Sequence, residues 1–125
     1  MRLLLDTHIF LWYLKNDSKL PKSICDKIDN SDEVYISSAS IWEAAIKIKL
    51  KKLDADINEL INSFSKLDFI ELPITAKHAA TVCNLKNVHS DPFDRILIAQ
   101  AISEPLTFLT ADTLLKKYSD LVEVI

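Results

Sequence analysis

Leu3-Leu4-Leu5-Asp6, near the start of the chain, predicts a short buried β-strand that ends at a carboxylate. A strand that is apolar on both faces is typical of a parallel sheet covered by helices. Further short apolar runs alternate with helical patterns along the chain. We therefore expect an α/β fold with a mostly parallel, five-stranded sheet flanked by helices on both faces. The expected strands cover residues 2–6, 33–37, 69–72, 106–110 and 122–125.

Helices are expected between these strands, where apolar residues recur at helical spacing. Thr75 is suited to cap one of them. The alternating Ile46-Lys47-Ile48-Lys49-Leu50-Lys51 also fits a half-buried strand, but the spacing of Glu43 and Lys47 favours a helix. The expected helices cover residues 8–15, 21–28, 38–50, 56–67, 76–85, 91–103 and 113–118.

Composition limits the possible classes of protein. The 125 residues predict one domain over residues 1–125, and 49% hydrophobic with 26% charged residues is typical of a soluble globule. No apolar run approaches the roughly 20 residues that span a bilayer, so we expect no membrane partner. Cys25 and Cys83 have no metal-binding spacing, which favours reduced thiols and a cytoplasmic location. The absence of glycine excludes glycine-rich phosphate loops.

Four acidic residues, of which Asp6 is the first, lie next to apolar runs. The carboxyl ends of parallel strands share one edge of a sheet, so acids distant in sequence are expected to meet there. Clustered carboxylates repel one another unless a cation neutralises them, and Mg²⁺ prefers oxygen ligands. The pattern predicts a metal site and phosphodiester chemistry. The four residues are Asp6, Glu43, Asp94 and Asp112.

The net charge of −3 does not argue against a nucleic-acid substrate. Setting these four aside, 18 acidic residues less four leaves 14 against 15 basic ones. With divalent ions in the site, the working charge is positive.

Each acid also has a purely structural interpretation. Asp6 and Asp112 are placed to cap the helices that follow them, and Asp91 is placed to cap the helix that contains Asp94. Glu43 fits a capping box with Ser40, or an ion pair with Lys47. The common edge of the predicted sheet favours the shared site over these separate roles.

Four motifs, in this order and spacing, resemble PIN-domain ribonucleases, specifically the VapC-type toxins of toxin–antitoxin pairs. The resemblance covers essentially the whole chain. It departs from the family at residues 49–53, where relatives often carry a glycine after the helix that holds the glutamate. The motifs lie at Leu4–His8, Ser37–Lys47, His89–Ala101 and Leu109–Asp112.

The resemblance implies a metal-dependent endoribonuclease that uses one or two Mg²⁺ or Mn²⁺ ions, acts on RNA, forms a homodimer and is inhibited by an antitoxin protein. It places Asp6, Glu43 and Asp94 in the metal site, with Asp112 as the fourth acid. Supporting roles fall to Thr7, Ser37, Asp91, Arg95 and Thr110. Among these, Asp91 is expected to be the N-cap that aims Asp94, and Arg95 is expected to pair with Asp91 rather than contact phosphate.

Two other functions compete with this one. A phosphatase with Asp6 as nucleophile usually needs a second aspartate two residues later, where this chain has His8. A non-catalytic interaction module would use the acids only as caps or as a partner surface. His8, His78 and His89 share no ligand spacing, so core or surface roles are expected for them. The lysines of residues 47–52 fit either an RNA backbone or a solvated helix face.

Overall fold

The computed structural model describes residues 1–125 and contains one five-stranded sheet in the order β3-β2-β1-β4-β5. All four strand pairings are parallel, which confirms the expected sheet. Each predicted strand is present to within two residues at its ends. The strands are β1 (Arg2–Leu5), β2 (Glu33–Ser37), β3 (Ile70–Leu72), β4 (Thr107–Thr110) and β5 (Val122–Val124).

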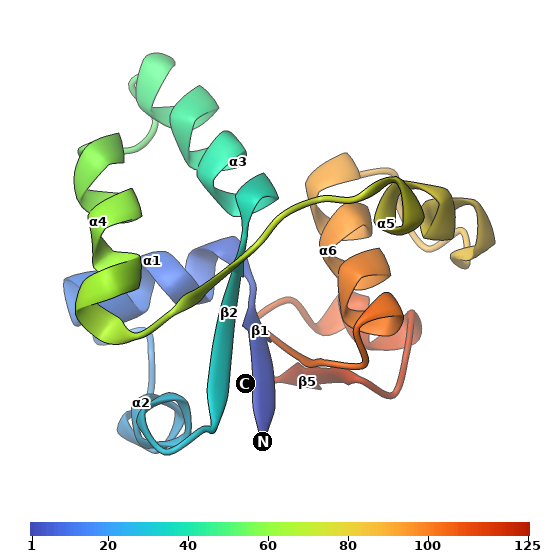
Figure 1. Ribbon diagram of the computed structural model, residues 1–125, viewed down its shortest axis with the longest axis horizontal. Coiled ribbons are helices and arrows are strands. Elements are labelled where there is room, and N and C mark those ends of the chain that lie inside the picture. The colour runs from blue at the N-terminus through green and yellow to red at the C-terminus, as the bar shows by residue number, and fades with distance from the viewer.

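Helices cover both faces of this sheet (Figure 1). The α3–α4 pair extends beyond the carboxyl ends of the strands, while α5 and α6 lie on the other side of β1 and β2. No helix is long and apolar enough to cross a membrane. The α-helices are α1 (Thr7–Lys15), α2 (Lys22–Asp29), α3 (Ser38–Lys49), α4 (Ile57–Leu67), α5 (Ala76–Thr81) and α6 (Pro92–Ser103), and the 3₁₀ helices are η1 (Val82–Asn84) and η2 (Thr113–Lys117).

The helix predicted over residues 76–85 is present over residues 76–84, but its last turn is a 3₁₀ helix. The segment begins as α5, with Thr75 as its N-cap, and continues as the 3₁₀ helix η1. Thr81 lies at the change and its hydroxyl donates to the carbonyl of Lys77 at 2.8 Å. Such bonding back to the preceding turn weakens and bends helices. The ambiguous passage at residues 46–51 is helical over residues 46–49, as favoured, and α3 ends at Lys49.

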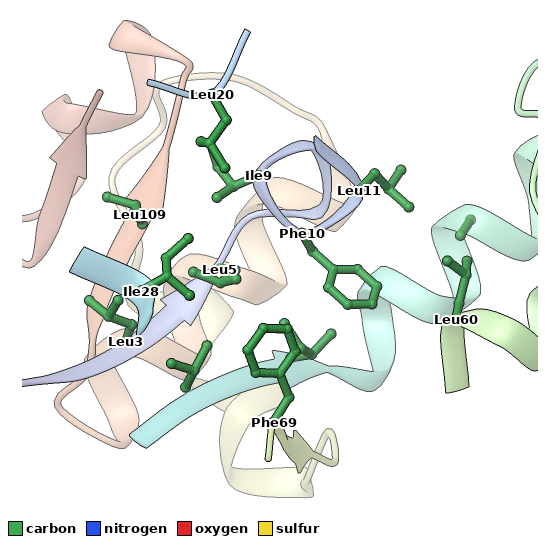
Figure 2. Close-up of a cluster of buried hydrophobic side chains, with 13 residues drawn as sticks. Leu3, Leu5, Ile9, Phe10, Leu11, Leu20, Ile28, Leu60, Phe69 and Leu109 are labelled. Carbon is green, nitrogen blue, oxygen red and sulfur yellow. The ribbon is translucent and has the colours of Figure 1, made fainter. Parts of the chain in front are cut away.

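Alternate side chains of β1 enter two separate cores. Leu3 and Leu5 pack with α1, α2 and α4 on one face, whereas Leu4 packs with α6 on the other. Figure 2 shows the first core, in which Phe10 lies against Phe69. All three leucines are completely buried. Because side chains pack against both faces of β1, the position of its end, and of the residue that follows it, is fixed by both cores.

The chain ends its helices without glycine. The three residues with left-handed backbone are Asn16, Lys51 and Asp68, which follow α1, α3 and α4. After α3, the amide of Lys52 donates to the carbonyl of Lys47 at 2.8 Å, and the amide of Lys51 to the carbonyl of Ile48 at 3.0 Å. This is the Schellman arrangement, which normally places glycine where Lys51 lies, at φ 59°. The expected departure from the family pattern therefore falls on a residue in strained backbone.

We predict that Lys51→Gly stabilises the protein. A left-handed conformation costs a non-glycine residue roughly 1–2 kcal/mol, and the extra unfolded-state freedom of glycine offsets about 0.5–1 kcal/mol of that. The free energy of unfolding should rise by up to about 1 kcal/mol in urea denaturation. Lys49→Gly is the matched control, since it removes the same charge two residues earlier, at the last residue of α3, and should destabilise by up to about 1 kcal/mol. Equal effects of the two substitutions would contradict the strain argument.

Candidate functional site

The strand order changes direction beside β1. From β1 the chain moves through β2 to β3 on one side, then crosses to β4 and β5 on the other. The point of reversal lies between β1 and β4, and ligand sites in open α/β sheets form there, beyond the carboxyl ends of the strands. Asp6 directly follows β1, and Asp112 lies two residues beyond β4. Both line one crevice of about 290 Å³, together with His8, Trp12 and Ala111, and we call it the acidic crevice.

Asp6 is a buried carboxylate with only 6% of its surface exposed. Its backbone amide extends the ladder to Leu109 of β4 at 2.9 Å. One carboxylate oxygen accepts the Thr7 amide at 2.8 Å, and the other accepts the Thr110 hydroxyl at 2.6 Å. Asp6 therefore caps α1 as expected. It also accepts a hydrogen bond from Thr110 of β4, which capping does not require.

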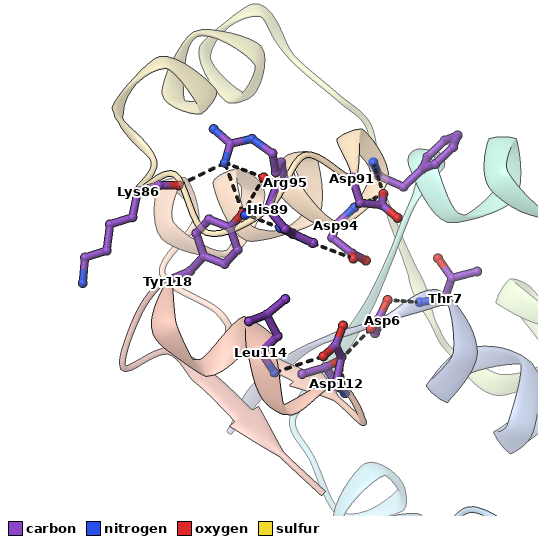
Figure 3. Close-up of polar contacts among 12 residues, drawn as sticks. Asp6, Thr7, Lys86, His89, Asp91, Asp94, Arg95, Asp112, Leu114 and Tyr118 are labelled. Atoms are coloured by element: carbon purple, nitrogen blue, oxygen red, sulfur yellow. Dashed lines mark hydrogen bonds and ion pairs between the residues drawn. The ribbon is translucent and has the colours of Figure 1, made fainter.

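Thr110 connects the two acids of the crevice. Its oxygen accepts the backbone amide of Asp112 at 3.1 Å while its hydroxyl proton is donated to Asp6. Asp112 is exposed, and one of its oxygens accepts the Leu114 amide at 3.0 Å, so it caps η2 as its structural interpretation predicts. Figure 3 shows Asp6, Asp94 and Asp112 around one space.

Asp94 lies in the first turn of α6, whose N-cap is Asp91. The Asp91 carboxylate accepts the amides of Phe93 and Asp94 at 2.9 and 3.1 Å, which confirms the capping prediction. One oxygen of Asp94 contacts Nε2 of His89 at 3.0 Å. Nδ1 of the same ring lies 2.5 Å from the hydroxyl of Tyr118, a residue that is 5% exposed.

Sequence reasoning missed His89 and Tyr118. The expected core or surface role for His89 is incomplete, because its ring bridges Tyr118 and Asp94 (Figure 3). The signal available in the sequence was the five-residue spacing of His89 and Asp94 across the start of a predicted helix. Nothing in the sequence marks Tyr118, which follows η2 and comes close only in the folded chain.

The expected pairing of Arg95 with Asp91 is wrong. The Arg95 guanidinium instead donates to the carbonyls of Lys86 and His89, at 3.0 and 3.3 Å, and to the Tyr118 hydroxyl at 3.1 Å. The Asp91 carboxylate instead accepts the backbone amides of Phe93 and Asp94 as the helix cap. Arg95 thus fastens the 86–89 loop to Tyr118, the residue that follows η2.

Glu43 lies within α3, one turn past its start. Ser37, not Ser40, is the N-cap of α3, so the capping box between Ser40 and Glu43 does not form. One Glu43 oxygen accepts from the Lys47 ammonium at 2.9 Å, the ion pair expected from their spacing. The buried Ser40 hydroxyl instead accepts from the Thr7 hydroxyl at 2.8 Å and ties α3 to α1.

The pKa values of Asp6 and Asp94 are raised, in each case partly by the charge of a neighbouring acid. Burial, together with the negative charge of Asp94, raises the pKa of Asp6 to about 6, even though the hydrogen bonds from Thr110 and Thr7 lower it. Burial also raises the pKa of Asp94, as do the charges of Asp91 and Glu43, while the contact with His89 lowers it. Three of the four predicted site acids therefore interact electrostatically, and Asp112 adjoins them through Thr110.

The donor chemistry of this edge fits a hard divalent cation. Asp94, Glu43 and Asp112 each engage one carboxylate oxygen in a hydrogen bond and leave the other without a protein partner. Lys47, on Glu43, is the only lysine or arginine that pairs with any of the four acids. As the side chains stand, no three carboxylate, imidazole or thiol groups are gathered closely enough to hold one ion. The acids share an edge of the sheet but are not assembled around a single point.

Comparisons with known proteins give a consistent result. The model of the PIN domain family matches residues 3–121. Ribonuclease VapC22 of Mycobacterium tuberculosis is 26% identical over 117 residues, which cover 92% of this chain and 90% of the relative.

Two solved structures share the fold over nearly the whole chain. VapBC2 from Rickettsia felis, bound to a DNA fragment from its promoter, has a TM-score of 0.77 at 18% identity and covers 99% of this chain and 98% of that one. DNA-bound VapBC from Salmonella typhimurium has a TM-score of 0.70 at 17% identity, with coverage of 100% and 97%.

We predict that Asp6 makes the metal-free protein less stable as pH rises. Because its pKa is about 6 in the folded protein against an ordinary 3.8, the folded state holds the proton more tightly. The loss of folding stability caused by Asp6 is absent below pH 3.8. It grows as the pH rises towards 6 and is constant above that. Across this window the free energy of unfolding should fall by roughly 2–3 kcal/mol more in the wild type than in Asp6→Asn.

Urea denaturation in EDTA at a series of pH values measures this difference. Asp54→Asn, at an exposed side chain outside the acidic crevice, is the control and should keep the wild-type pH dependence. Identical slopes for the wild type and Asp6→Asn would show that the buried carboxylate carries no such penalty.

Proposed function

This chain belongs to the PIN domain family, and from that premise we propose that it is a metal-dependent endoribonuclease, the toxin of a toxin–antitoxin pair. The observation that carries the proposal is the crowding of carboxylates where the strand order reverses. Asp6 is buried there at the end of the central strand, and its pKa is raised in part by the charge of Asp94. The name of the curated relative, a ribonuclease, supports the same reaction class.

We assign the metal-binding role to Asp6, Glu43, Asp94 and Asp112. When bound, one or two Mg²⁺ or Mn²⁺ ions supply an activated water and neutralise charge on the leaving oxygen. The chain itself fixes the carboxylates: Thr7 and Thr110 hold Asp6 at both oxygens, and Lys47 holds Glu43. The Ser37 hydroxyl is occupied as a helix cap and contributes by placing α3.

His89 is a positioning residue for Asp94 in this proposal. A neutral imidazole has one N–H, and its other nitrogen accepts. Donation from Nε2 to Asp94 requires Nδ1 to accept from the Tyr118 hydroxyl, and both contacts have suitable lengths. The bridge selects one tautomer and directs one oxygen of Asp94 towards His89, which leaves the other for an ion.

The partners follow from the same family assignment. We propose that RNA is the substrate and that a separate antitoxin chain inhibits the protein, in line with the VapBC complexes that share this fold. A homodimer is proposed because Trp42, Ile46 and Leu50 form an exposed apolar line along α3, at a spacing of four residues. Exposed apolar patches of this kind mark protein contacts.

One specific observation favours a non-catalytic module instead. Asp6, Asp91 and Asp112 all cap helices, and no metal-binding group is assembled. Capping alone, however, does not account for burying Asp6 against Thr110 or for placing Asp94 near it.

We predict discrete cleavage of bacterial total RNA by the purified chain in Mn²⁺ or Mg²⁺, with 5′-phosphate and 3′-hydroxyl ends. EDTA should abolish it, and Asp6→Asn, Glu43→Gln and Asp94→Asn should each lower the rate by at least roughly 100-fold, beyond the loss typical of residues that only support a ligand. Asp54→Asn should cleave like the wild type. Folded protein that neither binds Mn²⁺ calorimetrically nor cleaves would support the non-catalytic module.

We predict that Tyr118→Phe weakens Mn²⁺ binding by about 10- to 100-fold, because removing the hydroxyl frees His89 to rotate or to change tautomer. The ring, which packs in the second core, is retained. Isothermal titration calorimetry measures the affinity, and thermal denaturation checks the fold. Tyr35→Phe is the matched control, since its hydroxyl bonds Glu33 away from the crevice. Unchanged Mn²⁺ affinity in Tyr118→Phe would exclude the positioning role.

A further inference from the structure

A second groove adjoins the acidic crevice, and four of its nine lining residues are lysines. It runs between α1, the loop after α1 and the end of α3, and has a volume of about 320 Å³. His8 and Trp12 line both hollows, so the two lie next to each other. We call it the lysine groove. Its lining residues are His8, Leu11, Trp12, Lys15, Asp17, Lys19, Lys47, Lys52 and Leu53.

The charge of the lysine groove is positive in a protein whose net charge is −3. Lys15, Lys19 and Lys52 are exposed and form no ion pair, whereas Lys47 is paired with Glu43. The single carboxylate, Asp17, accepts the backbone amide of Lys19 at 2.9 Å. Three unneutralised ammonium groups therefore gather beside a site dominated by carboxylates.

An aromatic surface joins the two hollows. The Lys19 ammonium lies 5.8 Å from the centre of the Trp12 ring, and the His8 ring lies 6.1 Å from it. Trp12 is partly exposed and His8 is exposed. Aromatic faces beside a cationic track are the features with which proteins hold single-stranded nucleic acid, through base stacking and phosphate contacts.

We propose that the lysine groove binds the RNA strand on one side of the phosphate to be cleaved. This inference rests on the proposed ribonuclease function and extends it to the path of the substrate. Lys15, Lys19 and Lys52 contact phosphates, and Trp12 stacks on a base next to the acidic crevice. His8 and Lys15 are seven residues apart on α1, roughly 10 Å, which matches about three stacked nucleotides.

The groove favours RNA over an acidic protein segment because charge and aromatic faces occur together. An acidic peptide offers carboxylates to the lysines but a planar ring only where its sequence supplies one, whereas every nucleotide carries both a phosphate and a planar base to place against Trp12. The position of the groove also matters, because a strand bound there continues into the crevice that holds Asp6 and Asp112. The largest groove near α1, bordered by α4, contains neither Trp12 nor any of the four site acids.

The test compares two triple variants with the same change in charge. Lys15→Gln/Lys19→Gln/Lys52→Gln removes the groove charges, and Lys22→Gln/Lys77→Gln/Lys117→Gln removes three exposed lysines that line neither hollow. Both are made in full-length Asp94→Asn protein, so that RNA is bound without being cut. Binding of a short labelled single-stranded RNA is followed by fluorescence anisotropy over a range of salt concentrations.

We expect the groove variant to bind at least about tenfold more weakly, and the slope of log affinity against log salt to fall by about 2, from three phosphate contacts at about 0.7 each. The control variant should retain the slope of its parent. Equal slopes in the two variants would overturn the proposal. So would a lysine-dependent salt slope for poly-glutamate with none for RNA, which would make the groove a site for an acidic protein segment.

A second measurement tests the stacking. The chain has two tryptophans, so Trp42→Phe leaves Trp12 as the only one. Its fluorescence should be quenched by RNA but not by inorganic polyphosphate, which carries charge without bases. Equal quenching of Trp12 by RNA and by polyphosphate would contradict stacking of Trp12 on a base.

The two proposals fail separately. Total-RNA cleavage is assayed in parallel with wild-type residues at all four acids. No cleavage by that protein contradicts the ribonuclease, whereas cleavage that the groove substitutions leave unchanged contradicts only the groove.

Discussion

The burial of the Asp6 carboxylate at the end of the central strand is the constraint on which the functional edge of this protein depends. A charged group taken out of water needs hydrogen bonds or a counter-charge. Thr7 and Thr110 supply two hydrogen bonds, but no lysine or arginine pairs with this carboxylate, and the nearby Asp94 makes ionisation harder. The fold therefore places β4 and α6 so that Asp6 stays buried and close to the charge of Asp94. A protein selected only for stability has no use for such an arrangement, whereas a site for a cation does.

Most of the fold could be predicted from the sequence, because its signals are local. The apolar run at Leu3–Leu5 and the helical spacing elsewhere determine strand and helix type, and the alternation of the two requires a parallel sheet. The change from α5 to the 3₁₀ helix η1 was not predictable from spacing; it coincides with the Thr81 hydroxyl that bonds back to the preceding turn. The position at which α3 ends was also not predictable from the sequence. The backbone hydrogen bonds of Lys51 and Lys52 show it, with Lys51 in the left-handed region.

The candidate site could be predicted only in part, for a different physical reason. Strand ends are predictable, so the shared edge of Asp6 and Asp112 follows from the topology. Side-chain partners are not predictable in this way, because they depend on directions fixed by packing. Arg95 contacts Tyr118 and two carbonyls rather than Asp91, and His89 connects Asp94 to a tyrosine from a distant segment. The lysine groove likewise combines α1 with the end of α3, a pairing that no single stretch of sequence contains.

The hydrogen bonds of the Thr110 hydroxyl affect the stage of folding at which the acidic crevice forms. It joins residues 104 positions apart in the sequence, and it accepts from Asp112 while it donates to Asp6. Contacts of such long range carry the largest loop-closure cost and generally form late in folding. During synthesis, β1, β2 and β3 emerge from the ribosome before Thr110 and Asp112 are available to Asp6. The acidic crevice is therefore absent from every nascent or truncated chain that stops before β4.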